Sequence, residues 1–208
     1  MSRVLATVLA LVGLGGCASA RPAPAEPADP APTGAAPAVD FTASVQVGAD
    51  ALTISYRLVN HSGGDLVALN RVPAFSSGGA QLENPGAVYV TGAAGGRVEV
   101  AKRAFAMPQT DKMSWNHAAL VGATVVHDGQ PVTEEFTVGL PLHRSHPYGD
   151  DIGDGPIALP SPVTEVVFCL GVVPAASLPP AVRESLNVPH LSATTASQHL
   201  FCSPPVKL

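Results

Sequence analysis

Apolar and polar residues alternate along two neighbouring segments that follow a proline-rich start. In residues 39–47, and again in residues 52–58, every second residue is apolar, and those between are mainly threonine, serine and other polar types. Successive side chains of a β-strand point to opposite faces of its sheet, so strict alternation places one set in the core and the other in solvent. The pattern therefore predicts two strands, each buried on one face.

Seven further apolar segments predict strands. They are residues 66–70, 87–91, 97–103, 120–126, 132–140, 163–173 and a short stretch around 199–202. The longest of them, residues 163–173, alternates little, which indicates a strand buried on both faces. Pro179 and Pro180 then predict a single helical turn, because proline suits the first turn of a helix.

Turn-forming residues between these segments predict two hairpins. A glycine-rich link at residues 92–96 joins the segments on either side of it. The pair Asp128-Gly129 joins the segments that precede and follow it, because such a pair tolerates the positive φ of tight turns. In residues 132–140, Glu134 falls on the apolar face, and we expect it near the solvent end of the strand.

Eight or nine short strands at this spacing predict an all-β fold, built as an antiparallel sandwich. The 20 glycines and 21 prolines of the 208-residue chain fit this prediction, because they interrupt helices and favour turns. Within residues 39–72 a strand ends in Asn60, a glycine-rich turn follows, and a short apolar strand comes next. This arrangement resembles the immunoglobulin-like β-sandwich domains of exported bacterial proteins, and the resemblance implies a fold without naming a function.

The first residues have the pattern of an export signal. Arg3 precedes an apolar run at residues 4–14, which is shorter than the roughly 20 residues of a membrane-spanning helix. The run ends in the sequence LGGC at residues 14–17, which resembles the lipobox of bacterial lipoproteins. The resemblance implies that residues 1–16 are a signal peptide. It also implies that Cys17 becomes the first mature residue and carries lipid, palmitate among the acyl chains.

The same resemblance implies where the protein resides. Ala18 follows the cysteine and is not the aspartate associated with inner-membrane retention, so a lipid anchor in the outer membrane or at the cell surface is implied. An alternative is an ordinary signal peptide with its cleavage site in the sequence ASA at residues 18–20, in which case Cys17 is removed.

Alanine and proline make up most of residues 18–38, and no apolar period is present there. Such a composition predicts an extended spacer that covers about 3.1 Å per residue. We therefore divide the chain into a signal peptide at residues 1–16, a lipidated cysteine with its tether at residues 17–38, and a β-sandwich domain at residues 39–208.

Two cysteines remain in the mature chain beside the lipidated one. Exported compartments are oxidising, so Cys169 and Cys202 are predicted to form a disulfide. The alternative is two separate buried thiols. Neither lies in a C-x-x-C sequence, which leaves redox catalysis without a motif.

Candidate contact residues gather in the long loop at residues 141–162. They are His143, His146, Tyr148, Asp150, Asp151 and Asp154. Loops at the end of a sandwich often carry binding residues, so this loop is the candidate binding site. The alternative is that Pro147 and Tyr148 pin a long connection against the sandwich.

Metal and enzyme hypotheses have weaker support. A metal site could use the imidazoles of His143 and His146, together with His117, His127 and two methionines elsewhere in the chain. Two histidines three residues apart in a loop do not, however, define a coordination geometry. The acidic residues only loosely match a calcium loop, because Ile152 stands where an oxygen ligand belongs and Ser161 stands in place of the closing glutamate. No serine lies in a G-x-S-x-G sequence, so no enzyme activity is predicted.

Charge and composition narrow the class of partner. The formal net charge is −5 and no basic run is present, which argues against nucleic acid, and aromatic residues are only 5 % of the chain, which weakens a carbohydrate platform. We therefore expect a membrane-anchored, non-catalytic envelope lipoprotein without a cofactor, whose β-sandwich binds another envelope protein or supports envelope structure. The alternative is a periplasmic or surface metal-binding protein that uses the loop histidines.

Overall fold

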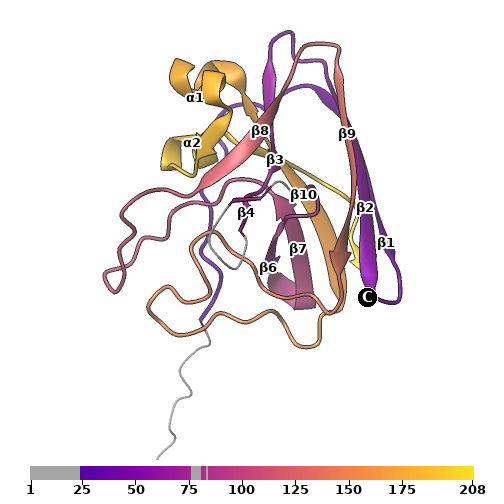
Figure 1. The fold of residues 1–208 in the computed structure, drawn as a ribbon, viewed down its shortest axis with the longest axis vertical. Helices are drawn as coiled ribbons and strands as arrows, with labels where there is room; N and C mark the ends of the chain where they lie inside the picture. Colours follow the sequence, from indigo (N-terminus) through magenta and orange to yellow (C-terminus); the bar gives the residue numbers. More distant parts are fainter. Residues whose placement is uncertain (1–23, 76–80, 83) are drawn as a thin grey trace, which may run out of the picture.

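The computed structural model describes residues 24–75, 81–82 and 84–208. Two β-sheets dominate this part of the chain and pack against each other as a sandwich, with the smaller sheet on the right of Figure 1. The prediction of an all-β sandwich is confirmed. The signal peptide and Cys17 lie outside the described residues.

The smaller sheet has three antiparallel strands in the order β1–β2–β9. Their bounds are β1 (Val39–Val47), β2 (Ala51–Asn60) and β9 (Pro131–Gly139). The alternation seen in the sequence directs every second side chain toward the other sheet, so that Leu52, Ile54 and Phe136 are buried. The opposite face of this sheet is exposed to solvent.

The larger sheet has eight strands, six of them in the order β11–β8–β3–β10–β7–β6, with β12 and β13 also paired to β10. The bounds are β3 (Leu66–Arg71), β6 (Tyr89–Gly92), β7 (Arg97–Lys102), β8 (Leu120–Val126), β10 (Glu165–Pro174), β11 (Asn187–Pro189), β12 (His199–Cys202) and β13 (Val206–Lys207). Leu170 pairs with Lys102 of β7 and with Phe201 of β12, so these strands flank β10 on opposite edges.

This sheet is mixed rather than wholly antiparallel, because β7 and β10 run parallel. Parallel neighbours need a long connection, and the chain between these two strands includes β8 and β9. All nine predicted strands are present. The remaining ones are β11, β13 and the separate pair β4 (Ala74–Phe75) and β5 (Gln81–Leu82), which at two or three residues are too short to show a period.

Asp128-Gly129 does not close a hairpin, which corrects the sequence prediction. Strand β8 pairs with β3 and β11 in the larger sheet, whereas β9 pairs with β2 in the smaller one. The turn is tight, with Gly129 at φ 74°, but it carries the chain from one sheet to the other. Asn60 holds this crossing, because its side chain donates hydrogen bonds to the carbonyls of Val126 and Gly64 at 2.8 and 2.7 Å.

Both faces of the larger sheet are buried. Leu66, Ala68 and Phe168 face the smaller sheet, while Val67 and Leu69 face a second core on the outer side. Burial of β10 on both faces confirms the prediction from its unbroken apolar run.

Short helical segments cover the outer core at the upper left of Figure 1. They are η2 (Ala175–Ser177), α1 (Pro180–Ser185) and α2 (Ser192–Ser197), while η1 (Ala94–Gly96) lies in the link between β6 and β7. The turn predicted from Pro179 and Pro180 is α1, with Pro180 as its first residue. Among the described residues, no helix is long and apolar enough to cross a membrane.

Candidate functional site

Residues 24–38, which we call the arm, differ from the predicted free spacer because they lie against the domain. Glu26 accepts hydrogen bonds from Arg144 at 2.8 and 2.7 Å. Asp29 forms an ion pair with Arg103 and accepts the backbone N–H of Ala106 at 2.6 Å. The alanines and prolines have no secondary structure here, and these two carboxylates fix their path instead.

Two buried arginines explain why the arm docks. The side chains of Arg103 and Arg144 are only 7 % and 5 % exposed, and each also pairs with a carboxylate of the domain, Glu99 and Asp150 respectively. A buried cation is costly without enough partners. The arm therefore supplies counter-charge for the domain as well as a connection to it.

The arm runs from one end of the domain to the other. In Figure 1 it begins in indigo at the lower end and rises toward α1 and α2. Thr33 marks its passage past α2, where its backbone N–H and its hydroxyl both donate to the carbonyl of Ala196, at 2.7 and 2.9 Å. Beyond this point Ala35 and Pro37 form one wall of a groove.

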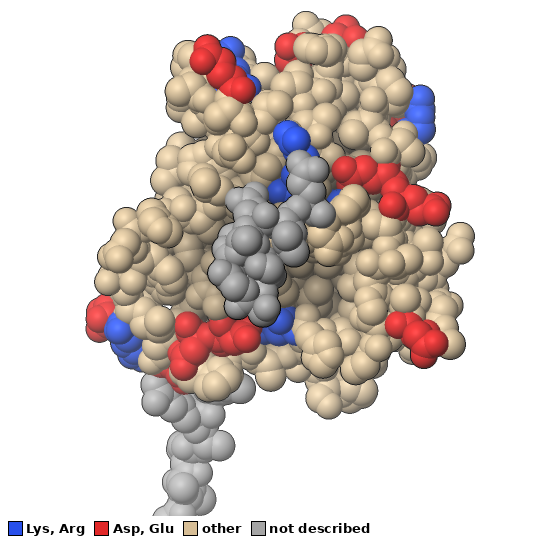
Figure 2. Space-filling view, in the orientation of Figure 1, with Lys and Arg blue, Asp and Glu red and all other residues tan. Residues whose placement is uncertain are grey.

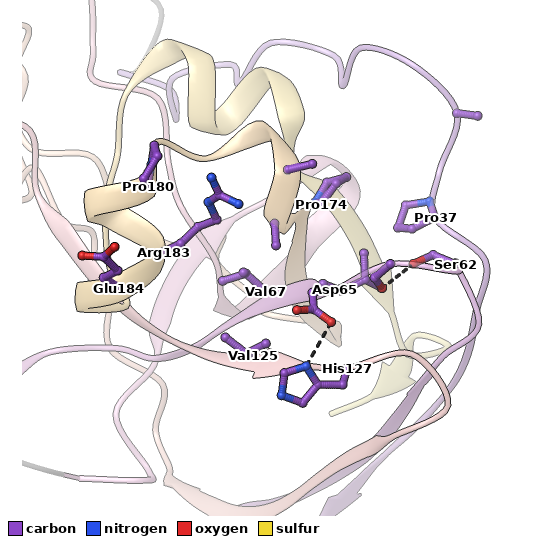
Figure 3. A pocket seen from close by; sticks show the side chains of 15 residues that line it. Pro37, Ser62, Asp65, Val67, Val125, His127, Pro174, Pro180, Arg183 and Glu184 are labelled. Atoms are coloured by element: carbon purple, nitrogen blue, oxygen red, sulfur yellow. Dashed lines mark hydrogen bonds and ion pairs between the residues drawn. The ribbon is translucent and has the colours of Figure 1, made fainter.

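That groove lies at the end carrying α1 and has a volume of about 870 Å³. Its walls come from the arm, the β2–β3 turn, the end of β8, η2 and α1. The floor is apolar and includes Val67 and Val125 (Figure 3). Asp65, His127 and Arg183 carry polar groups at its sides, and Arg183 extends from α1 toward the groove in Figure 3.

One polar pair in the groove has the histidine and the carboxylate of a catalytic triad. His127 Nδ1 lies 3.0 Å from Asp65 Oδ1, the contact that orients a general base in hydrolases. Nucleophilic catalysis also needs a hydroxyl or thiol hydrogen-bonded to the histidine. Among the described residues His127 bonds to no such group, and the nearby Ser62 hydroxyl donates to Asn60 Oδ1 at 2.7 Å.

The predicted binding loop is divided between core and surface. Tyr148 is buried, and its hydroxyl donates to the carbonyl of His190 at 3.3 Å. The ring of His146 packs edge-on against Phe105 at 4.8 Å, and Trp115 packs edge-on against Tyr148 at 5.5 Å. These contacts agree with the alternative in which the loop is pinned to the domain.

Burial also determines the charge of two histidines in this region. It lowers the pKa of His146 to about 4, aided by the nearby Arg144. It lowers the pKa of His190 to about 4 as well, aided by His146 and Arg103. Both rings are therefore neutral at pH 7, and His190 accepts the backbone N–H of Phe105 at its Nδ1 atom.

The exposed residues of the loop do not converge on one point. His143 is exposed, Asp150 pairs with Arg144 at 2.8 Å, and Asp154 pairs with Lys112. Asp151 accepts the backbone N–H groups of Gly153 and Gly155, which closes a turn within the loop. Within the described ranges, no group of three or more histidine, cysteine, aspartate or glutamate side chains could hold a metal ion.

The predicted disulfide is confirmed between Cys169 and Cys202. The two residues are direct partners in the register of β10 and β12, with Cα atoms 4.1 Å apart. The bond fastens β12 to β10, the strand at the centre of the larger sheet.

A further polar cluster lies between the two sheets, and sequence reasoning missed it. Glu134 of β9 accepts a hydrogen bond from Lys102 of β7 at 2.7 Å and from Asn70 of β3 at 2.6 Å. Lys102 is 1 % exposed and Asn70 3 %. Glu134 lies on the inner face, as its place in the alternation predicts, and is 23 % exposed, but its two partners from the other sheet were not predicted.

Charged residues on the face seen in Figure 2 form small groups, some of mixed and some of single sign, separated by uncharged surface. The chain matches no protein-family model, and comparisons with curated proteins and with solved structures also found no match.

Proposed function

We propose that this chain is an exported lipoprotein, anchored through Cys17, whose β-sandwich works by binding another envelope protein rather than by catalysis. The observation that carries the proposal is the position of the arm. It runs from the end of the domain nearest the anchor to the groove at the opposite end.

Docking of the arm limits how far the domain can lie from a membrane. Glu26 is the first described residue with a hydrogen bond to the domain, and Cys17 lies nine positions before it. A fully extended chain covers at most about 3.6 Å per residue, which allows about 30 Å here, against about 80 Å if the whole segment to Val39 were free. The domain then stays close to the lipid surface with its groove directed away from it.

The groove has the features of a binding surface. Its volume lies within the range of ligand sites in proteins, its floor is apolar, and a few polar groups stand around it. An extended segment of another protein fits this description, because apolar contacts supply affinity while the charged rim supplies specificity.

In-cell photo-cross-linking tests the proposal. A photoreactive residue replaces Ala176, which is exposed in the groove, and in a matched variant it replaces Ala94, which is exposed in η1 at the other end. We expect one defined protein partner from position 176 and none from position 94. Equal labelling from both positions, or none from several groove positions, contradicts the binding role.

The anchor has a separate test. Cys17→Ser removes the lipidated thiol, so the variant should leave the membrane fraction and lose metabolic lipid labelling. A serine variant that stays membrane-bound with unchanged labelling contradicts the anchor, whatever the cross-linking shows.

A further inference from the structure

Three strands each carry one polar residue on an inward-facing side that is otherwise apolar. Asn70 follows Leu66 and Ala68 on β3, and Lys102 follows Val100 on β7. Glu134 stands between apolar residues on the inner face of β9. Each strand therefore brings one polar group to the same place in the core.

Strands β3 and β7 both pair with one edge of β10 and contact each other there. Lys102 is the partner of Leu170 on β10, and Ala68 is the partner of Val172. The regular pairing of β3 ends at Ala68, because its register with β8 shifts between Ala68 and Arg71. The side-chain contacts with Glu134, rather than the strand register, therefore place Asn70 beside Lys102.

One carboxylate joins the two nitrogen atoms. Lys102 Nζ lies 2.7 Å from Glu134 Oε2, and Asn70 Nδ2 lies 2.6 Å from Glu134 Oε1. Because these oxygens belong to the same group, the amine and the side-chain amide are held next to each other. The Asn70 carbonyl oxygen is buried and has no hydrogen-bond partner among the described residues.

Low polarity around the cluster favours a reactive amine. Lys102 is 1 % exposed, and its ammonium group lies 4.1 Å from the centre of the Phe136 ring. Burial lowers the pKa of Lys102 despite the hydrogen bond from its amine to Glu134. A buried lysine that gives up its proton easily is a nucleophile, and a neighbouring carboxylate can accept that proton.

We propose that Lys102 and Asn70 become joined by a side-chain amide bond, with Glu134 as the catalytic proton carrier. Glu134 accepts a proton from the ammonium group of Lys102, and the neutral amine adds to the side-chain carbonyl carbon of Asn70. Glu134 then returns a proton to Nδ2, the bond between this carbon and Nδ2 breaks, and ammonia leaves. The proton that the amine nitrogen loses passes through Glu134 to the ammonia.

The reaction is balanced without any other reagent. One C–N bond forms, one C–N bond breaks, one ammonia is released, and no atom changes its oxidation state. Asn70 and Glu134 also line a cavity of about 380 Å³, which gives the ammonia a way out of the core. The link would fasten β3 to β7 on one edge of β10, while the disulfide fastens β12 on the other.

Mass spectrometry of the full mature chain, purified from membranes and reduced, tests the link. Digestion should give a branched peptide that contains both Asn70 and Lys102, with the mass of its two parts less one ammonia. Trypsin should fail to cut after Lys102. Two separate unmodified peptides, with Lys102 open to amine reagents after denaturation, overturn the proposal without any variant.

Glu134→Gln tests the role of the carboxylate. A positioned acid–base group contributes roughly 10²–10⁴-fold to a rate, so the variant should form the link slower by about that factor. Glu135→Gln makes the same chemical change on the exposed face of β9 and should form the link fully. Equal linking in the two variants overturns the assignment of Glu134.

Discussion

The loop at residues 143–154 and the cluster of Asn70, Lys102 and Glu134 contain similar chemical groups in different surroundings. In the loop, each exposed carboxylate has a partner of its own near the surface, such as Arg144 or Lys112. In the cluster, one carboxylate serves two residues from other strands inside the core.

This difference shows that density of polar residues along a chain is a poor guide to where chemistry concentrates. The loop is rich in histidine and aspartate because it is long and largely exposed. Its carboxylates accept hydrogen bonds within local turns or form ion pairs with neighbouring side chains. The cluster combines proximity with exclusion of water, which strengthens electrostatic interactions and shifts proton affinities.

The largest effect is expected from Glu134→Ala. The substitution leaves the ammonium group of Lys102 buried, and the carbonyl of Pro85 is then its one hydrogen-bond partner among the described residues. Breaking a buried ion pair on one side costs about 3–5 kcal/mol of unfolding free energy. Urea denaturation followed by circular dichroism measures it, and Glu135→Ala on the exposed face is the control, with a change below about 0.5 kcal/mol.

A double variant separates an ion pair from a covalent link. Replacing both charges by apolar residues, Lys102→Met with Glu134→Leu, is often neutral for a buried pair, so stability should return if the pair alone matters. If the proposed link exists, the double variant stays less stable by up to about 4 kcal/mol, because a loop of about 33 residues is no longer closed.

The second prediction concerns acid. Burial lowers the pKa of His190 to about 4, below the ordinary value of 6.5, so the unfolded chain binds more protons than the folded one between these values. Stability is therefore complete above pH 6.5 and falls as the pH drops toward 4, by about 3 kcal/mol for this one residue. Denaturation at several pH values measures the slope.

Variants identify the source of that slope. His190→Asn should reduce the decline in stability and leave the part that His146 contributes, whereas His143→Asn, at an exposed position of the loop, should leave it unchanged. An identical decline in wild type and His190→Asn contradicts the prediction and points to other groups.

The third prediction concerns the arm. Asp29→Asn keeps the shape of the side chain but leaves the buried Arg103 with Glu99 as its one ion-pair partner among the described residues. Hydrogen bonds to charged groups contribute about 1.5–3 kcal/mol, so we expect a loss in that range. Amide hydrogen exchange in residues 24–38 should become faster.

Asp40→Asn is the control for the arm. Its side chain is 77 % exposed and pairs with His61 on the surface, so the substitution should change stability by less than about 0.5 kcal/mol. Unchanged exchange in the arm of Asp29→Asn would mean that the backbone and apolar contacts hold the arm without this ion pair.

Much of the fold could be predicted because strand patterns are local. Alternation in β1 and β2, and its absence in β10, identified strands and the faces they bury. Strand partners are not a local property. Asp128-Gly129 predicted a hairpin between β8 and β9, but β9 pairs with β2 along its whole length. In that register the apolar residues Ile54 and Phe136 lie opposite each other.

The cluster left one signal in the sequence, which did not reveal its partners. Glu134 stood out as a polar residue on an apolar face, and Asn70 and Lys102 occupy the same kind of position in their own strands. Alternation alone cannot show that three such residues meet, because that depends on the register of strands far apart in the sequence. The disulfide was predictable because only two cysteines were left to pair.

The smallest effect is expected within the loop itself and bears on whether it binds anything. His143 is exposed, so His143→Ala should change the unfolding free energy by less than about 0.5 kcal/mol. Tyr148→Phe removes a buried hydrogen bond to the carbonyl of His190 and should cost about 1 kcal/mol. If the surface of the loop contributes to binding, His143→Ala weakens capture of the cross-linked partner while stability is preserved. If capture is unaffected by His143→Ala and falls only in variants that lose stability, the loop is a structural connection and the groove alone carries the binding role.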